Sequence, residues 1–193
     1  MAEEKENRRV KLTKIILKNS LVELMRENSI SKISVKMICE TADVNRSTFY
    51  SHYVDQFALL KDIELNAFTE LKKYINKLEK HLQDRNDPKT TQGIKDILIY
   101  IQNNADIFRV LLSDNGDIKF QKDLMLWIHQ QTIEDFWHAK NPCTIMKDYG
   151  PGFMATGALN ILQTWLKNGM KESPEEMSEF ITKILYNGLS SFI

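Results

Sequence analysis

Helix-breaking residues are scarce in this chain and absent from its first 85 residues. The 193 residues include four prolines and seven glycines, and all of them follow residue 85. Because helix interiors tolerate these two residues least, the first 85 residues are predicted to be helical with short interruptions. No alternation of apolar and polar residues is long enough to predict a strand. The fold class is therefore predicted to be all-α.

Other scarcities exclude whole classes of protein. The two cysteines, Cys39 and Cys143, lack metal-ligand spacing, which predicts free thiols in a reducing cytosol and no metal site. No run approaches the roughly 18 apolar residues of a membrane span, and the charged N-terminus does not resemble a secretory signal. The four histidines are scattered, and no phosphate-binding glycine loop or nucleophile elbow occurs. The sequence predicts a cytoplasmic protein without cofactor or membrane partner that is not an enzyme.

Positive charge is concentrated near the N-terminus of a chain whose net charge is zero. Residues 5–53 hold ten Lys or Arg and five Asp or Glu, so this segment carries +5 and the remainder −5. A basic module on an acidic body is typical of a DNA-binding head, although a solvated helix face gives the same pattern. Arg8, Arg9 and Lys11 are candidates for a DNA-binding arm, diluted by the acidic residues beside them.

The segment 34–60 is the most informative, because it predicts two short helices joined by a tight turn and followed by a longer helix. Ser34 and Asn45 are N-cap candidates for the two short helices. Phe49 and Tyr53 lie four residues apart on the inner face of the second one. The outward positions are small, polar or basic: Arg46, Ser47, Thr48, Tyr50 and His52. A short helix with such a face suits the major groove of DNA.

This segment resembles the helix-turn-helix of TetR-family transcriptional regulators. The matching residues are Ser34-Val35, Ile38-Cys39, Thr48-Phe49-Tyr50-Ser51-His52-Tyr53 and Leu59-Leu60. Cys39 stands where the family usually has Ala, Asp43 replaces a usual turn Gly, and Gln56 replaces a common phosphate-binding Lys. Asp tolerates a left-handed turn, so we expect the turn to form. The missing Lys should weaken affinity for the DNA backbone.

DNA contacts are predicted at nine residues: Ser34, Lys36, Asn45, Arg46, Ser47, Thr48, Tyr50, His52 and Gln56. Arg46, Ser47 and Thr48 are the base-edge candidates, because an Arg fork suits guanine and a Thr methyl group suits thymine. Tyr50 and His52 resemble phosphate contacts of the family, whose donors position the protein on the duplex.

Two domains are predicted, a helix-turn-helix domain over residues 1–54 and a helical effector-binding and dimerisation domain over residues 55–193. The first helix is expected at 9–27. The three head helices are expected to share a small core of Ile16, Leu24, Ile38, Val44, Phe49 and Tyr53. A long helix from 55 to about 83 should link the domains and end at the breaker cluster 84–88.

Five further helices are predicted in the second domain, at about 91–103, 105–113, 117–139, 146–168 and 174–187, with a break at 141–142. Gly169 should stop the fourth of these, and Ser173 with Glu176 forms a capping box for the fifth. Residues 153–185 resemble the C-terminal domain of the dihydroxyacetone-kinase-regulator branch of TetR-like proteins. That resemblance implies a homodimer in which the last two helices form a four-helix bundle.

Candidates for the dimer interface are Phe153, Gly157, Ile161, Trp165, Phe180 and Ile184. The small residues between 150 and 158 would let helices approach closely, either in a partner or in the domain's own core. Candidates for an effector cavity are Phe68, Tyr100, Phe108, Trp127, His129 and Trp165. The alternative is that these aromatic residues are simply core.

The predicted function is a homodimeric, sequence-specific and ligand-responsive repressor that binds a palindromic operator. Its predicted partners are double-stranded DNA, a second copy of itself and a small-molecule effector. The alternative is a TetR-like coactivator that acts through a protein partner, as in dihydroxyacetone-kinase operons. The missing turn Gly and the missing Lys favour that alternative, whereas the run Arg46-Ser47-Thr48 together with His52 favours direct DNA binding. A ligand-binding enzyme has no supporting motif.

Overall fold

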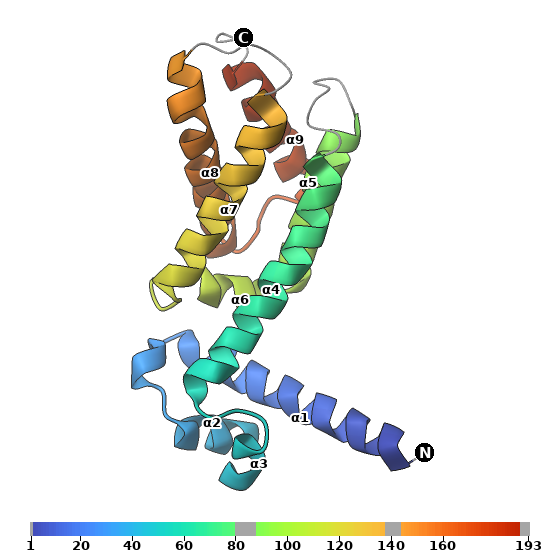
Figure 1. The fold of residues 1–193 in the computed structure, drawn as a ribbon, viewed down its shortest axis with the longest axis vertical. Helices are drawn as coiled ribbons and strands as arrows, with labels where there is room; N and C mark the ends of the chain where they lie inside the picture. Colours follow the sequence, from blue (N-terminus) through green and yellow to red (C-terminus); the bar gives the residue numbers. More distant parts are fainter. Residues whose placement is uncertain (1, 80–87, 138–143, 190–193) are drawn as a thin grey trace.

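A helical head and a helical body lie at opposite ends of one long helix (Figure 1). The computed structural model describes residues 2–79, 88–137 and 144–189, and every regular element within these ranges is helical, which confirms the all-α prediction. The helices are α1 (Ala2–Met25), the 3₁₀ turn η1 (Ile30–Lys32), α2 (Val35–Ala42), α3 (Arg46–Tyr50), α4 (Gln56–Glu79), α5 (Pro88–Asn103), α6 (Ala105–Leu111), α7 (Ile118–Trp137), α8 (Thr144–Lys167) and α9 (Pro174–Leu189).

Most predicted helices are present, with shifted ends. Helix α1 begins seven residues earlier than predicted, at Ala2 rather than residue 9, and α5 begins at Pro88 rather than 91. Proline is accepted there because the first turn of a helix has no partner for its N–H. The predicted break at 141–142 and most of the one at 84–88 lie outside the described residues.

The core of the head differs from the prediction at one residue of α1. Leu17, Leu21 and Met25, spaced four apart, are fully buried, whereas Ile16 is 44% exposed. Successive residues of a helix point about 100° apart, so the stripe centred on Leu21 turns Ile16 toward solvent. The prediction of Ile16 as a core residue was wrong. Phe49 is fully buried and fixes α3 against this core.

Three predicted helix ends are confirmed. Ser34 accepts a hydrogen bond from the backbone N–H of Met37 at 3.3 Å and so caps α2. Asp43 ends α2 in the left-handed region, at φ 52° and ψ 46°, so the turn forms without the usual glycine. The Ser173–Glu176 capping box opens α9, with Glu176 N–H donating to Ser173 Oγ and Ser173 N–H to Glu176 Oε2. Asn45, by contrast, makes no side-chain capping bond to α3.

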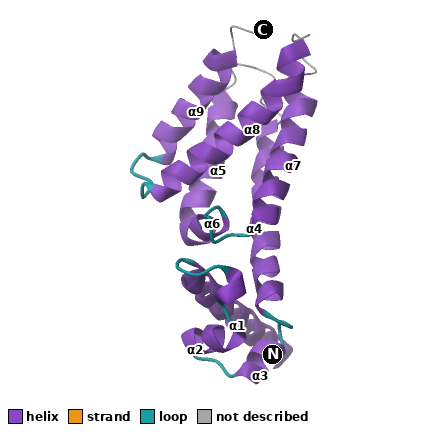
Figure 2. Cartoon of the chain, turned by 90° about the vertical axis from the view of Figure 1, so that its left-hand side faces the viewer, coloured by secondary structure: helices purple, strands orange, loops and turns teal. Residues whose placement is uncertain are grey.

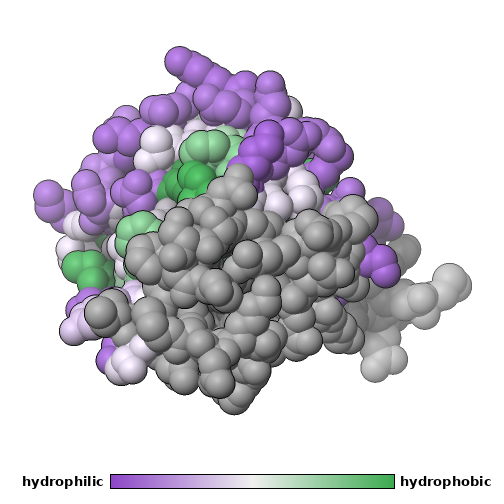
Figure 3. Space-filling model, turned by 90° about the horizontal axis from the view of Figure 1, so that it is seen from above, coloured by the Kyte–Doolittle hydropathy of each residue, from purple (hydrophilic) through white to green (hydrophobic). Residues whose placement is uncertain are grey.

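The body is built from helices that pack side by side, α5 against α4 and α9, and α7 against α8 (Figure 2). Gly93 allows the close approach of α5 to α4, because a Cβ at this position would lie 2.9 Å from Leu78 Cδ1. Seen from the end opposite the head, the described surface is mostly hydrophilic with small hydrophobic patches (Figure 3). No helix in the described ranges is long and apolar enough to cross a bilayer.

Glu64 of α4 is a buried acid at the level where α4 leaves the head. It is 3% exposed, and its Oε1 has no hydrogen-bond partner among the described residues. Its Oε2 lies 3.7 Å from Lys61 Nζ, and that lysine is itself mostly exposed. Burial raises the pKa of Glu64, and the nearby Asp117 raises it further, while Lys61 opposes both effects.

We expect Glu64→Gln to raise the free energy of unfolding at pH 7 by about 1–2 kcal/mol, because it removes a buried and poorly paired charge. The pKa of Glu64 is higher in the folded chain than in the unfolded one. Its charge therefore destabilises the fold only at a pH above its pKa in the unfolded chain, which is about 4.3. The gain should therefore shrink as the pH falls toward 4 in denaturant titrations. Glu23→Gln on the exposed face of α1 is the control. Equal stability of Glu64→Gln and the parent at pH 7 would contradict this account.

Candidate nucleic-acid interface

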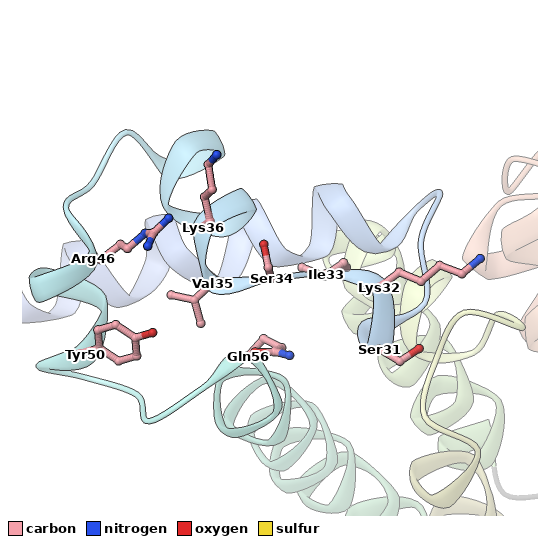
Figure 4. A pocket seen from close by; sticks show the side chains of 9 residues that line it. All are labelled: Ser31, Lys32, Ile33, Ser34, Val35, Lys36, Arg46, Tyr50 and Gln56. Atoms are coloured by element: carbon pink, nitrogen blue, oxygen red, sulfur yellow. The ribbon is translucent and has the colours of Figure 1, made fainter.

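A hollow of about 430 Å³ opens between η1, α2, α3 and the start of α4. Figure 4 labels its nine lining residues: Ser31, Lys32, Ile33, Ser34, Val35, Lys36, Arg46, Tyr50 and Gln56. In this view Arg46 points from α3 toward α2, and Tyr50 lies across the hollow from the first turn of α4. Five of the nine predicted DNA contacts therefore lie around this one hollow. They come from three separate helices or their caps.

The other four predicted contacts lie nearby. Asn45 lines a second hollow of about 390 Å³, which shares Lys36 and Arg46 with the first. Ser47 is exposed, and Thr48 is half-buried along the same short helix. His52 is half-buried directly after α3. None of the nine predicted residues is buried, so each is accessible to a ligand at the surface.

The first hollow is electropositive. Lys32, Lys36 and Arg46 line it, and no acidic residue does. Lys36 Nζ lies 3.7 Å from Glu40 Oε1, but both side chains are more than 60% exposed, and such pairs contribute little. Backbone N–H groups at the start of α2 add partial positive charge beside Ser34. Cationic side chains, hydroxyl groups and a helix start in one place suit phosphate oxygens.

Helix α3 is only five residues long, so its position depends on side chains around it. Tyr53, three residues after α3, donates its hydroxyl to Asp62 Oδ2 of α4 at 2.7 Å. Lys18 of α1 reaches the same oxygen at 3.0 Å, and Lys14 Nζ lies 5.6 Å from the centre of the Tyr53 ring. These contacts join the end of α3 to both α1 and α4.

The charge on Asp62 is maintained by these donors. Burial by itself would raise the pKa of Asp62, but hydrogen bonds from Tyr53 and Lys18 outweigh it and hold the pKa below its usual value. Burial and the bond to Asp62 raise the pKa of Tyr53. Sequence reasoning missed Asp62 and Lys18, because no motif links residues that meet only through packing. It also missed Lys32, although a lysine two residues before the Ser34 cap is visible in the sequence.

The predicted effector residues largely pack on one another. Phe68 and Trp127 have ring centroids 5.4 Å apart, and those of Tyr100 and Phe108 are 5.7 Å apart. Trp165 is 2% exposed and donates its indole N–H to the carbonyl oxygen of Glu172 at 3.0 Å. The sixth residue, His129, is half-buried.

The predicted dimer residues divide into two groups. Phe153 is 74% exposed, Phe180 49% and Ile184 44%, and nothing lies within 4 Å of a Cβ placed on Gly157. Ile161 is partly buried. Trp165 lies inside the core of its own chain and does not reach the surface formed by the others, because its ring packs in the body.

In the described ranges, no three His, Cys, Asp or Glu side chains gather in a way that could hold a metal ion.

The sequence profile of a family described as a transcriptional regulator C-terminal region matches residues 89–187, just over half of the chain. The chain belongs to the TetR family of transcriptional regulators. This confirms the family suggested by its sequence motifs. A solved TetR transcriptional regulator from Streptococcus agalactiae is 25% identical, with a TM-score of 0.58 over 95% of this chain and 98% of that one.

Two curated relatives are also regulators. The uncharacterised HTH-type transcriptional regulator YxbF of Bacillus subtilis (strain 168) is 24% identical over 169 residues, which are 88% of this chain and 43% of that protein. The HTH-type dhaKLM operon transcriptional activator DhaS of Lactococcus lactis is 38% identical over 60 residues, 31% of this chain and 32% of that protein. The matched residues thus cover less than half the length of either curated relative. Both are regulators rather than enzymes, in agreement with the prediction of no catalytic activity.

We expect Tyr53→Phe to lower the free energy of unfolding by about 1–2 kcal/mol, because it removes a hydrogen bond to a charged group. The pKa of Asp62 is lower in the folded chain than in the unfolded one. Its contacts therefore stabilise the fold fully at a pH above its pKa in the unfolded chain, about 3.9, and this stabilisation is lost as the pH falls through its pKa in the folded chain. The difference between parent and variant should therefore be greatest near neutral pH in denaturant titrations. Tyr50→Phe, which alters an exposed ring, is the control. A pH-independent difference would contradict this assignment.

Proposed function

We propose that this TetR-family chain is a sequence-specific DNA-binding regulator, with a helix-turn-helix domain over residues 1–54 and an effector-binding and dimerisation domain over residues 55–193. The observation that carries the proposal is the electropositive hollow shared by Lys36, Arg46 and Tyr50. In the proposed complex α3 lies in the major groove, with Arg46, Ser47 and Thr48 facing base edges. Ser34, Lys36 and the residues after α3 contact phosphates.

We further propose a homodimer formed by α8 and α9. Tyr149, Phe153 and Gly157, spaced four apart on α8, form one stripe, and Tyr149 is 73% exposed. Phe180 and Ile184 form a second stripe on α9. Exposed aromatic and aliphatic side chains that gather on helices are typical of an interface. A two-fold dimer presents two copies of α3, which suits a palindromic operator.

Repression is the proposed mode of action, with a small-molecule effector that shifts the dimer between DNA-binding and released states. The second candidate is activation through a protein partner. It is favoured by the similarity to a relative named as an operon activator and by Gln56, which stands where a cationic residue is common in the family. The regular turn at Asp43 supports direct DNA binding, because it gives α3 a regular helix-turn-helix geometry.

Titration with the DNA upstream of the protein's own gene, at two salt concentrations, tests the proposal. We expect binding that weakens steeply with salt, because phosphate contacts release counterions. Arg46→Ala should cost about 1–3 kcal/mol of binding free energy and relax the preference for one base pair. Lys72→Ala, an exposed lysine of α4 away from the hollow, should bind like the parent. Absence of binding by the folded parent at low salt would favour the protein-partner alternative.

Phe153→Glu should convert the protein from dimer to monomer at micromolar concentration, because it places a charge in the proposed apolar interface. Sedimentation equilibrium would measure the mass, and circular dichroism would verify that the helices remain. Ile118→Glu is the matched control, since Ile118 is 66% exposed at the start of α7 and a glutamate suits a helix start. A Phe153→Glu protein that remains a dimer would place the interface elsewhere.

A further inference from the structure

The body contacts the head through α6 and the turn that follows it, in addition to the continuous helix α4. Asn115 in this turn donates from Nδ2 to the carbonyl oxygens of Met25 and Arg26, both at 3.3 Å, at the C-terminal end of α1. Arg26 Nη2 lies 2.9 Å from Asp106 Oδ1 on α6. These polar contacts connect the last turn of α1 to the body.

Two hollows open beside these contacts and share Arg109, Ser113 and Asp114. The larger one, of about 620 Å³, lies between α6 and the C-terminal end of α8. The smaller one, of about 350 Å³, reaches Arg26 of the head. Because they have three lining residues in common, we treat them as one feature, the junction groove. Its size is within the range of small-molecule sites, roughly 300–1,000 Å³.

The lining of the junction groove carries more positive than negative charge. Arg26, Arg109 and Lys167 contribute three positive charges, and Asp114 is the acidic residue among the lining residues. Phe108, Leu112 and Leu166 also line the larger hollow, but they are 1%, 5% and 3% exposed and present little surface to a ligand. A ligand that matches this lining carries an anionic group.

Arg109 is oriented for such a ligand. Its Nε donates to the carbonyl oxygen of Leu166 at 3.3 Å, which holds the planar group against the end of α8. Its Nη1 lies 3.6 Å from Asp106, beyond ordinary hydrogen-bond distance. A ligand carboxylate could replace this longer ionic contact, because Arg binds carboxylates with paired hydrogen bonds.

Replacing the contacts of Asp106 should cost little. Arg26 and Asp106 are 55% and 59% exposed, and solvent-exposed ion pairs contribute little to stability. A carboxylate between Arg26 and Arg109 would take over the role of Asp106, which lies 2.9 Å from Arg26 and 3.6 Å from Arg109. Because one arginine belongs to the head and the other to the body, the ligand would favour one arrangement of the two.

We propose that the junction groove binds a small organic acid, with its carboxylate between Arg26 and Arg109. The site is separate from the packed aromatic residues of the body core, apart from Phe108. Its regulatory role rests on the proposed ligand-responsive function, but the binding itself does not.

The test is a titration of the ¹⁵N-labelled full chain, without DNA, with benzoate, octanoate and 4-phenylbutyrate, and with the neutral amide of each acid as matched probe. We expect at least one acid to shift the resonances of residues 108–116 and 163–169, and its amide to bind at least tenfold more weakly. Arg109→Gln should weaken acid binding at least tenfold. Arg26→Gln, at an exposed position, provides a second variant if the first does not fold.

Lys122→Gln on α7 removes one exposed positive charge outside the groove and should leave acid binding unchanged. The proposal is overturned if no acid binds, if acid and amide bind equally, or if the shifts lie among the core aromatic residues. Operator titrations with and without the acid then separate the two proposals. DNA binding without acid binding would contradict only the proposed groove site. Acid binding without an effect on operator affinity would contradict only the regulatory role of the groove.

Discussion

Helix α4 packs in both the head and the body, and the rest of the architecture depends on that constraint. Near its start, Asp62 holds Tyr53 at the end of α3 and Lys18 of α1. Further along, Phe68 packs on Trp127 of α7, and Leu78 meets α5 where Gly93 allows close approach. One continuous helix therefore contacts α1, α5, α7 and the segment that follows α3.

The junction between head and body has polar contacts at its edge, beside buried apolar residues that form one cluster from the head to the body. Glu64 is buried there with an unsatisfied oxygen, and Asn115 and Asp106 make the direct contacts to the end of α1. Polar interfaces between domains rearrange more readily than close-packed apolar cores, because the lost hydrogen bonds are replaced by water. The polar contacts at the end of α1 are therefore the part of the junction that water replaces most readily.

The sequence predicted local features well and contacts between distant residues poorly. Helix caps at Ser34 and Ser173 and the left-handed turn at Asp43 follow from residue type and spacing over a few positions, and the structure has them. Ile16 was misplaced because a one-residue error in a helical stripe is a 100° rotation. The Tyr53–Asp62 bond and the junction groove depend on how separate helices dock. No periodicity within one helix encodes that docking, so neither could be predicted.

The proposed interface needs geometric precision as well as charge. Position 56 carries glutamine where the family commonly has a lysine, so one cationic phosphate contact is missing from a head whose residues 5–53 carry +5. Non-specific affinity comes almost wholly from phosphate contacts, whereas base contacts require α3 to be held in position. The buried Phe49 and the Tyr53–Asp62 bond provide that support for a helix of five residues. In the proposed complex, a firmly held α3 therefore favours discrimination between DNA sequences.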